Sequence, residues 1–333
     1  MTKTRIAING FGRIGRNLFR LLLNHPKIEV VAINDIADNK TMSHLTKYDS
    51  IHGVLPYEIK YNDTSIFVDQ KEYLFLHEKE ISNLDWKSLE IDIVIEATGK
   101  FKTWELANQH IVAGAKKVIL SAPSEDETIK TVVMGINESI LEGSEIIISN
   151  ASCTTNNAAP MIKVMQSIGE IKQAYITTIH SYTTDQSLHD QPHKDLRRAR
   201  GASQSIVPTT TGAAKAITKI FPDLEGKIGG CGIRVPVPDG SLTDITFNLK
   251  EKVTIEEINI AFKNASDGIL NGILAYTEDP IVSVDIIGNT NSCLFDSQLT
   301  SVIDNMVKVV GWYDNEIGYS SRLIDLINFV SKK

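Results

Sequence analysis

Near its start the chain reads Arg5-Ile6-Ala7-Ile8-Asn9-Gly10-Phe11-Gly12-Arg13-Ile14-Gly15. An apolar run typical of a buried strand leads into the glycines, and a segment of helical composition follows from Arg13. In this context Gly10 and Gly12 permit a tight turn and a close approach of backbone to a pyrophosphate, and Gly15 lets the helix pack on the strand. The helix N-terminus would face the phosphate charge. The stretch therefore predicts a dinucleotide-binding βαβ unit.

A carboxylate at the end of the second predicted strand indicates which dinucleotide is bound. The run Val30-Val31-Ala32-Ile33-Asn34 leads into Asp35, about twenty residues after Gly15. A carboxylate at this place can accept hydrogen bonds from both ribose hydroxyls and would repel a 2′-phosphate. NAD is therefore favoured over NADP. Thr98-Gly99, which closes a further strand, adds a candidate contact to the cofactor.

Strand and helix patterns alternate through the first 150 or so residues. Strands this apolar are typical of a parallel sheet covered on both faces, and the alternation favours a doubly wound domain. The predicted strands lie at 5–9, 28–34, 91–97 and 117–121, with helices at 13–24 and 103–113.

The second half has a different texture, with longer β runs and fewer helices, which is typical of an α+β domain. We expect an α/β fold in which a doubly wound Rossmann-type parallel sheet precedes an α+β catalytic domain with a mostly antiparallel sheet. The β runs lie at 171–180, 228–237, 242–249 and 306–312; helices are predicted at 211–220 and 255–265, and an amphipathic helix ends the chain.

Composition excludes several classes of protein. The 333 residues are 42% hydrophobic and 23% charged, and the net charge of −7 gives no support to a nucleic-acid or anionic-membrane partner. No apolar signal core opens the chain, and no window has the ~18 apolar residues of a membrane span. The three cysteines are odd in number and far apart, which fits reduced thiols and a cytoplasmic location. No Cys/His spacing indicates a zinc site, so we expect no metal.

One cysteine has the surroundings of a nucleophile. Ile146-Ile147-Ile148 leads into Ser149-Asn150-Ala151-Ser152-Cys153-Thr154-Thr155-Asn156, and helical composition follows to about Gln166. This pattern places the Cys153 thiol at or near the first turn of a helix, where the helix dipole favours an anion. We therefore expect a lowered thiol pKa and a partly ionised, reactive thiolate.

A candidate base follows at the end of a later β run. His180 closes Ala174-Tyr175-Ile176-Thr177-Thr178-Ile179-His180, directly before a long polar loop at 181–201. Loops of this length inside a compact domain are usually functional. His189 and His193, within the loop, are weaker candidates. A thiolate, a base and an NAD site together favour aldehyde oxidation through a covalent thiohemiacetal and a thioester.

Basic and hydroxyl side chains near these residues indicate two anion sites. The loop carries Arg197, Arg198 and Arg200, of which two could be solvated or face another subunit. Arg234 lies downstream, and Thr209-Thr210-Thr211-Gly212 precedes a helix. Two anion sites beside one nucleophile point to a phosphorylated aldehyde, with inorganic phosphate as the second reactant.

Along essentially its whole length the chain resembles one known family, the phosphorylating glyceraldehyde-3-phosphate dehydrogenases. The resemblance rests on several long and specific runs: Asn9–Arg16, Lys47-Tyr48-Asp49-Ser50-Ile51-His52-Gly53, Ser149–Asn156, His193–Arg200, Thr211–Ala216 and Trp312-Tyr313-Asp314-Asn315-Glu316.

The resemblance implies a role for each matching position. Cys153 would be the nucleophile and His180 its base. Thr183 and Arg234 would hold the phosphate of the substrate, with Arg198 between this site and that of the attacking phosphate. The attacking phosphate would be bound by Ser152, Thr154, Thr211 and Gly212. Asn315 would hold the nicotinamide carboxamide and Tyr319 would flank the ring; the remaining cofactor contacts would be Gly10, Phe11, Gly12, Arg13, Ile14, Asp35, Lys79, Thr98 and Ser121.

The resemblance also implies a homotetramer and a division of the chain. Residues 1–151 would form the NAD-binding domain, joined by the C-terminal segment 315–333, and 152–314 would form the catalytic domain. The sequence departs from the usual family pattern at several positions. Asn157 stands where a second cysteine is common, Lys79 where arginine is frequent, and Ile317 where tryptophan is common. Gln191 replaces a common leucine near the adenine ribose, which weakens the discrimination against NADP.

The leading hypothesis is NAD-dependent oxidation of glyceraldehyde 3-phosphate to 1,3-bisphosphoglycerate with inorganic phosphate, reversible in glycolysis and gluconeogenesis. One alternative is erythrose-4-phosphate dehydrogenase, a member of the same family that releases a free acid. Others are a catalytically silent NAD- or RNA-binding relative and a cysteine hydrolase. The hydrolase gives no reason for the glycine turn and Asp35.

Overall fold

The computed structural model describes residues 3–332. The chain divides into two compact units. The first comprises Met1–Val132, Glu138–Ala151 and Ser320–Lys333, and the second comprises Val133–Asn137 and Ser152–Tyr319. No helix of the described residues combines the length and the apolar character needed to cross a membrane.

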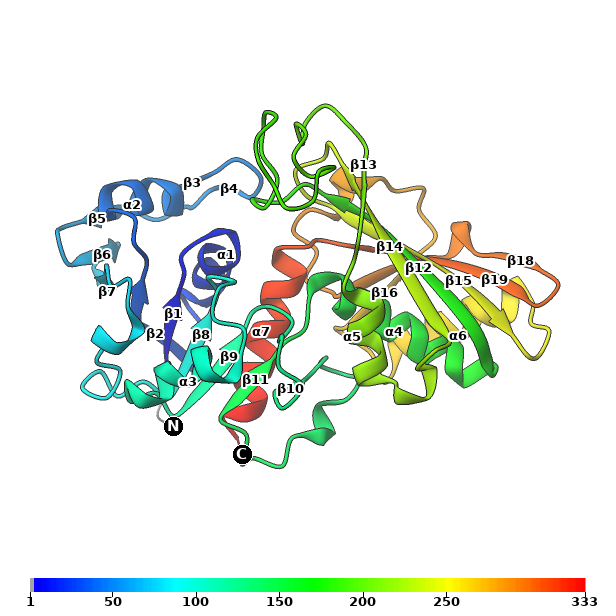
Figure 1. Cartoon of the computed structure of the whole chain (residues 1–333), viewed down its shortest axis with the longest axis horizontal. Helices are drawn as coiled ribbons and strands as arrows, with labels where there is room; N and C mark the ends of the chain where they lie inside the picture. Colours follow the sequence, from blue (N-terminus) through cyan, green and yellow to red (C-terminus); the bar gives the residue numbers. More distant parts are fainter. Residues whose placement is uncertain (1–2, 333) are drawn as a thin grey trace. The chain divides into compact units, whose positions relative to one another are not determined.

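The first unit is built on a large sheet whose central strands are parallel (Figure 1). Its order is β10-β11-β9-β8-β1-β2-β7-β6-β5. In this sheet β6 pairs antiparallel with β5 and with β7, and the other pairs are parallel. The elements are β1 (Thr4–Asn9), α1 (Arg13–Leu22), β2 (Ile28–Asn34), α2 (Asn39–Lys47), β3 (Tyr48–Asp49), β4 (Gly53–Val54), β5 (Ile59–Tyr61), β6 (Ser65–Val68), β7 (Lys71–Leu76), β8 (Ile93–Glu96), α3 (Trp104–Val112), β9 (Lys117–Leu120), β10 (Lys130–Thr131) and β11 (Ile147–Ser149).

Burial explains why this sheet is parallel and central. Ile6, Ala7 and Ile8 of β1 and Ile93, Val94 and Ile95 of β8 are all buried, so both faces of these strands are covered. In a parallel sheet all the carboxyl ends of the strands meet at one edge, where ligands of doubly wound folds bind. The ends of β1, β2 and β8 therefore lie together, at Asn9, Asn34 and Glu96.

The second unit contains a mostly antiparallel sheet in the order β13-β14-β12-β15-β19-β17-β16, with β18 beside β19 (Figure 1). Its elements are α4 (Cys153–Ile168), β12 (Ile171–Ser181), β13 (Val207–Thr209), α5 (Ala213–Ile220), β14 (Ile228–Val235), β15 (Ser241–Leu249), α6 (Ile255–Asp267), β16 (Leu274–Thr277), β17 (Cys293–Asp296), β18 (Ser301–Ile303) and β19 (Met306–Tyr313); α7 (Ile317–Val330) ends the chain.

Helix α4 packs on this sheet, contacting β12, β15, β17 and β19, with α5 and α6 beside it. A glycine makes the close contact possible, because a Cβ on Gly311 of β19 would lie 2.5 Å from Cys293 Sγ and 2.8 Å from Met161 Sδ. Asn157 of α4 adds polar anchors by donating to the carbonyls of Ser292 and Trp312 at 3.3 and 3.2 Å. The residue that replaces the common second cysteine thus holds the helix to the sheet.

The predicted fold class is confirmed: a parallel, doubly wound sheet and a mostly antiparallel α+β sheet are both present. The predicted strand at 28–34 has the same bounds as β2, and most other predictions differ by one to three residues at an end. The helix after the cysteine differs in a useful way. The sequence predicts a helix from about Asn156, whereas α4 begins at Cys153 itself.

Candidate active site

The glycine turn has the geometry that a bound pyrophosphate needs. Gly10 has a φ of +96°, and a Cβ there would lie 2.6 Å from the Thr98 nitrogen. A Cβ on Gly15 would lie 2.2 Å from the Gly10 oxygen, so only glycine lets α1 approach the turn this closely. A Cβ on Gly12 would have no atom within 4 Å, which leaves open space at the start of α1. The residues therefore fit a dinucleotide at this place.

Asp35 lies directly against the turn. Phe11 N–H donates to its Oδ2 at 2.7 Å, and Ala37 N–H donates to its Oδ1 at 3.0 Å. The adjacent backbone is tied as well, because Gly10 N–H donates to the Asn34 carbonyl at 2.8 Å. The carboxylate thus holds the glycine turn.

The other expected cofactor residues of the first unit are arranged in different ways. Phe11 is buried against Phe19 and Phe75, so its side chain belongs to the core and its backbone to the turn. Arg13 forms a two-pronged ion pair with Asp49, at 2.6 and 3.1 Å. Ile14 is half-buried, Lys79 is exposed after β7, and Ser121 follows β9, where its N–H donates to the Glu96 carbonyl at 2.9 Å.

A buried carboxyl group to which the sequence analysis gave no role lies beneath the turn. Glu96 is 2% exposed, and its Oε2 accepts from Asn9 Nδ2 at 2.6 Å. Its Oε1 accepts from the N–H of Thr98 at 2.8 Å and from the Thr98 hydroxyl. The signal in the sequence was an acidic residue inside an otherwise apolar strand, Ile93-Val94-Ile95-Glu96, which is rare unless the group is satisfied.

A histidine and a tryptophan complete this buried network. Trp86 Nε1 can only donate, and it donates to His110 Nδ1 at 3.0 Å. The hydrogen of the neutral ring is therefore on Nε2, which lies 3.1 Å from Glu96 Oε2 and donates to it. Both His110 and Trp86 are fully buried. Glu96 thus connects His110 of α3 with Asn9, which precedes the glycine turn, and with Thr98.

The predicted nucleophile and base are in contact within the second unit. Cys153 Sγ lies 3.4 Å from His180 Nε2. Ser152 caps α4, with its hydroxyl accepting from Thr155 N–H at 3.1 Å, so Cys153 is the first residue of the helix. His180 is the second-last residue of β12. The sheet and the helix packed on it therefore bring together two residues that are 27 apart in sequence.

The expected direction of the Cys153 pKa was wrong. Burial raises the pKa of the thiol, and this outweighs the opposing effects of Arg234 and of the Thr154 N–H at the helix start. The sequence indicates the helix start and its dipole, whereas burial of the thiol depends on the packing of the folded chain. Burial and the neighbouring Arg234 lower the pKa of His180 to about 3. In the free chain the pair is therefore thiol and neutral imidazole.

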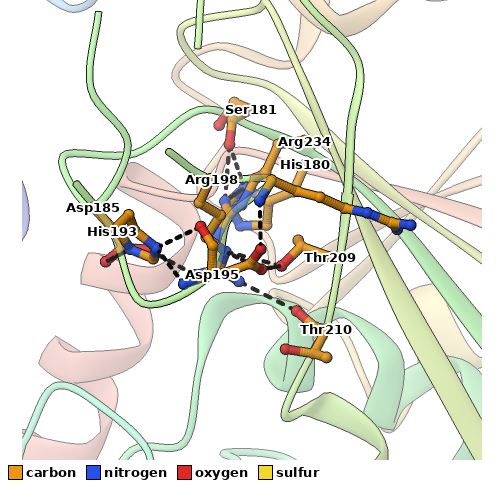
Figure 2. Close-up of polar contacts among 10 residues, drawn as sticks. His180, Ser181, Asp185, His193, Asp195, Arg198, Thr209, Thr210 and Arg234 are labelled. Carbon is orange, nitrogen blue, oxygen red and sulfur yellow. Dashed lines mark hydrogen bonds and ion pairs between the residues drawn. The ribbon is translucent and has the colours of Figure 1, made fainter. Parts of the chain in front are cut away.

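Arg234 contacts His180 at the ring nitrogen that does not face Cys153. Its Nη1 lies 2.5 Å from His180 Nδ1 and donates to the Ser181 carbonyl at 2.9 Å (Figure 2). A guanidinium only donates, so while Arg234 bonds to Nδ1 the hydrogen of the neutral ring is on Nε2; when Nδ1 instead donates to the Ser181 carbonyl, Nε2 is free to accept the proton of Cys153. The Ser181 carbonyl also lies 2.8 Å from Nδ1, ready to accept a hydrogen when the ring is protonated on both nitrogens.

Tyr313 connects α4, which carries Cys153, with β12, which carries His180. Its hydroxyl lies 2.9 Å from Thr154 Oγ1 of α4 and 3.0 Å from Thr178 Oγ1 of β12. Its ring and the His180 ring are T-shaped to each other, with centroids 5.9 Å apart. This buried tyrosine belongs to the distinctive run at 312–316, but the sequence predicted no role for it.

Arg198 is the loop arginine that reaches the site region (Figure 2). Its Nε donates to Thr209 Oγ1 at 2.9 Å and its Nη1 to Asp185 at 2.6 Å. Its charge contributes to lowering the pKa of both His180 and Arg234. Arg197 and Arg200 are less enclosed, and Arg200 pairs with Asp190 at 2.8 Å.

The remaining expected phosphate residues lie on the loop and at the start of α5. Thr183 follows β12 and is half-buried, and its side chain forms no hydrogen bond with Cys153, His180 or Arg234 within the described chain. Thr211 Oγ1 accepts from Ala213 N–H at 3.2 Å, and Gly212 precedes α5 as its N-cap. Asn315 and Tyr319 are both buried in the second unit, after β19.

Comparisons with known proteins agree over nearly the whole chain. A family model described as the NAD-binding domain of glyceraldehyde 3-phosphate dehydrogenase matches residues 4–104, and its C-terminal-domain counterpart matches residues 152–315. A glyceraldehyde-3-phosphate dehydrogenase of Geobacillus stearothermophilus is 51% identical over 331 residues, covering 99% of this chain and 98% of the relative. That of Mycobacterium avium is 53% identical over 335 residues, covering 98% of each chain. Glyceraldehyde-3-phosphate dehydrogenase 2 of Streptomyces avermitilis is 52% identical and covers 99% of each.

Proposed function

The chain belongs to the glyceraldehyde-3-phosphate dehydrogenase family, and from this premise we propose which of its residues carry the reaction. It is an NAD-dependent oxidoreductase that reversibly converts glyceraldehyde 3-phosphate and inorganic phosphate to 1,3-bisphosphoglycerate, in glycolysis and gluconeogenesis. The observation that carries the residue assignment is the 3.4 Å contact between Cys153 Sγ and His180 Nε2.

We assign the covalent steps to Cys153 and the proton transfers to His180. With the ring hydrogen of His180 on Nδ1 and donated to the Ser181 carbonyl, Nε2 takes the thiol proton while the Cys153 sulfur attacks the aldehyde carbon, which gives a thiohemiacetal. The protonated ring can donate from Nε2 to the substrate oxygen and from Nδ1 to the Ser181 carbonyl, 2.8 Å away. NAD, when bound, would supply the hydride acceptor for the thiohemiacetal carbon, and His180 Nε2 would take the hydroxyl proton. Phosphate then attacks the resulting Cys153 thioester, the C–S bond breaks to release the acyl phosphate, and the Cys153 thiolate takes a proton back from His180.

The low pKa of His180 has a place in this scheme. Arg234 contributes to it, because its guanidinium lies 2.5 Å from His180 Nδ1. We propose that Arg234 and Thr183 hold the phosphate of the substrate. A phosphate would compete with His180 for the guanidinium and neutralise its charge, which favours protonation of the ring as the thiol is lost.

The second anion in our scheme is the attacking phosphate, and we assign Arg198 to the region between the two phosphate sites. Arg198 is fixed on the loop side by Thr209 and Asp185. A fork of guanidinium donors suits phosphate oxygens, and the start of α5 offers backbone N–H groups. The residues proposed for the attacking phosphate are Ser152, Thr154, Thr211 and Gly212.

The cofactor residues of the first unit follow from the fit of its glycine turn. Gly10, Gly12 and the start of α1 suit the pyrophosphate, and Asp35 suits the adenine ribose. The full proposed set is Gly10, Phe11, Gly12, Arg13, Ile14, Asp35, Lys79, Thr98 and Ser121, with Asn315 and Tyr319 from the second unit.

The proposal extends to the organisation of the molecule above the site. We propose an NAD-binding domain at 1–151 with the segment 315–333, a catalytic domain at 152–314, a homotetramer and a cytoplasmic location. Exposed apolar side chains between β12 and β13 support assembly, Leu196 and Ile206 being 81% and 68% exposed. Light scattering after gel filtration should give about four times the 36.8 kDa of the chain. A monomer at micromolar concentration would reject the tetramer.

Substrate choice separates the two dehydrogenase hypotheses. Initial rates of NADH formation would be measured with glyceraldehyde 3-phosphate and with erythrose 4-phosphate, each with and without phosphate. We expect fast turnover only with glyceraldehyde 3-phosphate plus phosphate. Phosphate-independent oxidation of erythrose 4-phosphate at a higher rate would instead favour the alternative.

The cysteine assignment has its own experiment. Cys153→Ser should reduce oxidation by at least ~1,000-fold, because a serine hydroxyl is a far weaker nucleophile at neutral pH. NAD binding, followed by calorimetry, should persist. Cys231→Ser is the matched control, since Cys231 is a half-buried free thiol on β14 outside the proposed site. Equal activity of the two variants would refute the role of Cys153.

A further inference from the structure

Two buried serine hydroxyls converge on one oxygen of Asn315. Ser181 Oγ donates to Asn315 Oδ1 at 2.8 Å, and Ser241 Oγ donates to the same atom at 2.7 Å. The serines are 0% and 1% exposed, so water does not compete for these bonds. Both lone pairs of Oδ1 are therefore used by the protein.

The backbone fixes the direction of one of these hydroxyls. Ser241 Oγ accepts from the Ser181 N–H at 3.1 Å, so its own hydrogen is left to point elsewhere. Ser241 Oγ lies 2.7 Å from Asn315 Oδ1 but 3.5 Å from Ser181 Oγ, so its hydroxyl donates to the Asn315 oxygen. Ser181 ends β12 and Ser241 begins β15, and these strands pair. The sheet thus places both donors.

This arrangement decides which end of the amide is presented for binding. If the Asn315 amide were turned over, its NH₂ group would face two hydroxyls, and their hydrogens would lose their acceptor. Within the described chain Asn315 Nδ2 makes no hydrogen bond. Asn315 is therefore held with its oxygen inward and its donor group available.

A nicotinamide carboxamide carries one acceptor, its carbonyl oxygen, and one donor, its NH₂ group. We propose that Ser181 and Ser241 are positioning residues that select the donor end of Asn315 for the carboxamide oxygen and so fix the ring face that receives hydride. This inference rests on the proposed role of Asn315. Without the two hydroxyls the amide can turn, and the carboxamide can then pair in either sense.

Ser181 also connects this device to the base. Its side chain holds Asn315, while its carbonyl lies 2.8 Å from His180 Nδ1. A substitution by alanine removes the hydroxyl and keeps the carbonyl. The effect of the hydroxyl can therefore be measured with the backbone contact of the base in place.

The experiment uses the full-length enzyme with Ser181→Ala, Ser241→Ala and the double variant. The readouts are KM for NAD, kcat, and deuterium transfer from NADH labelled separately on each face of C4. We expect the double variant to raise KM for NAD at least about tenfold and to transfer measurable hydride from the minor face, with kcat changed less. The single variants should show smaller changes in the same direction, and they also serve if the double variant does not fold.

Thr243→Val is the matched control. Thr243 lies on β15 two residues after Ser241 and is also fully buried, and its hydroxyl has no hydrogen-bond partner in the described chain. We expect parental KM and stereochemistry from this variant. The proposal is overturned if the double serine variant behaves like Thr243→Val.

Asn315→Ala separates that outcome from failure of the premise. If Asn315→Ala raises KM for NAD while the serine variants match the control, Asn315 binds the cofactor but the serines do not orient it. If Asn315→Ala leaves KM and stereochemistry unchanged, the proposed role of Asn315 is itself rejected, and the inference falls with it.

Discussion

At the scale of the residue, we propose that Asp35 acts on the cofactor site in two ways. Its Oδ2 accepts from Phe11 N–H at 2.7 Å, which fixes the glycine turn, and in the proposed site its charge would disfavour a 2′-phosphate. A substitution that removes the charge but keeps an oxygen acceptor separates the two effects. Asp35→Asn meets that condition, because an amide oxygen can still accept from the Phe11 N–H.

Asp35→Asn should raise the ratio of kcat/KM for NADP to that for NAD at least about tenfold, because the charge repulsion is lost while the turn stays tied. Initial rates with both cofactors measure this ratio. Asp63→Asn, an exposed carboxyl between β5 and β6, is the control. An unchanged ratio in Asp35→Asn would contradict the assignment of Asp35 to the ribose.

At the scale of the element, the ends of three parallel strands are joined beneath the glycine turn. Asn9 ends β1, Asn34 ends β2 and Glu96 ends β8. Asn34 Nδ2 donates to Asn9 Oδ1 at 2.8 Å, and Asn9 Nδ2 donates to Glu96 Oε2 at 2.6 Å. The strand ends are therefore tied into one network, and Thr98 is attached to the same carboxyl group.

Glu96→Gln should weaken NAD binding about tenfold or more. The new NH₂ group would face donors from Asn9, His110 or Thr98, leaving buried polar groups unsatisfied next to the turn. Calorimetric titration with NAD measures the dissociation constant. Cys153 lies in the other unit, so the rate of its alkylation by iodoacetamide should stay within about twofold. Parental NAD affinity would show that the network does not support the turn.

At the scale of the whole molecule, a buried acid makes stability depend on pH. Burial and the nearby carboxylates Asp314 and Glu316 raise the pKa of Asp239 to about 8. In the unfolded chain this acid has a pKa of about 4. Between these values the folded chain holds a proton that the unfolded chain has lost, so this group lowers the free energy of unfolding progressively as pH rises from about 4 to about 8.

Asp239→Asn removes this dependence, since an amide does not titrate and can still accept from Gly240 N–H. The variant should unfold at a higher temperature than the parent at about pH 8, with a smaller difference at about pH 5. Thermal unfolding at both pH values measures this. The same difference at both would mean that Asp239 does not carry the proton.

Local patterns in the sequence were sufficient for the fold class, the glycine turn, Asp35 and the candidate pair Cys153 and His180. These features depend on near neighbours in the chain: apolar periodicity, glycines at fixed spacing, and a strand–turn–helix order. The bounds of β2 and the start of α4 close to Cys153 follow from the same local forces.

Only the tertiary structure decided the electrostatics and the supporting contacts of the site. Whether the Cys153 pKa rises or falls depends on how deeply the thiol is buried, which is set by packing and not by the helix start alone. The contacts of Arg234 with His180, of Glu96 with Asn9, and of Ser181 with Asn315 join residues from 54 to 134 positions apart. Hydrogen bonds act over about 3 Å, so the sequence named their donors and acceptors but the fold alone determined which ones meet.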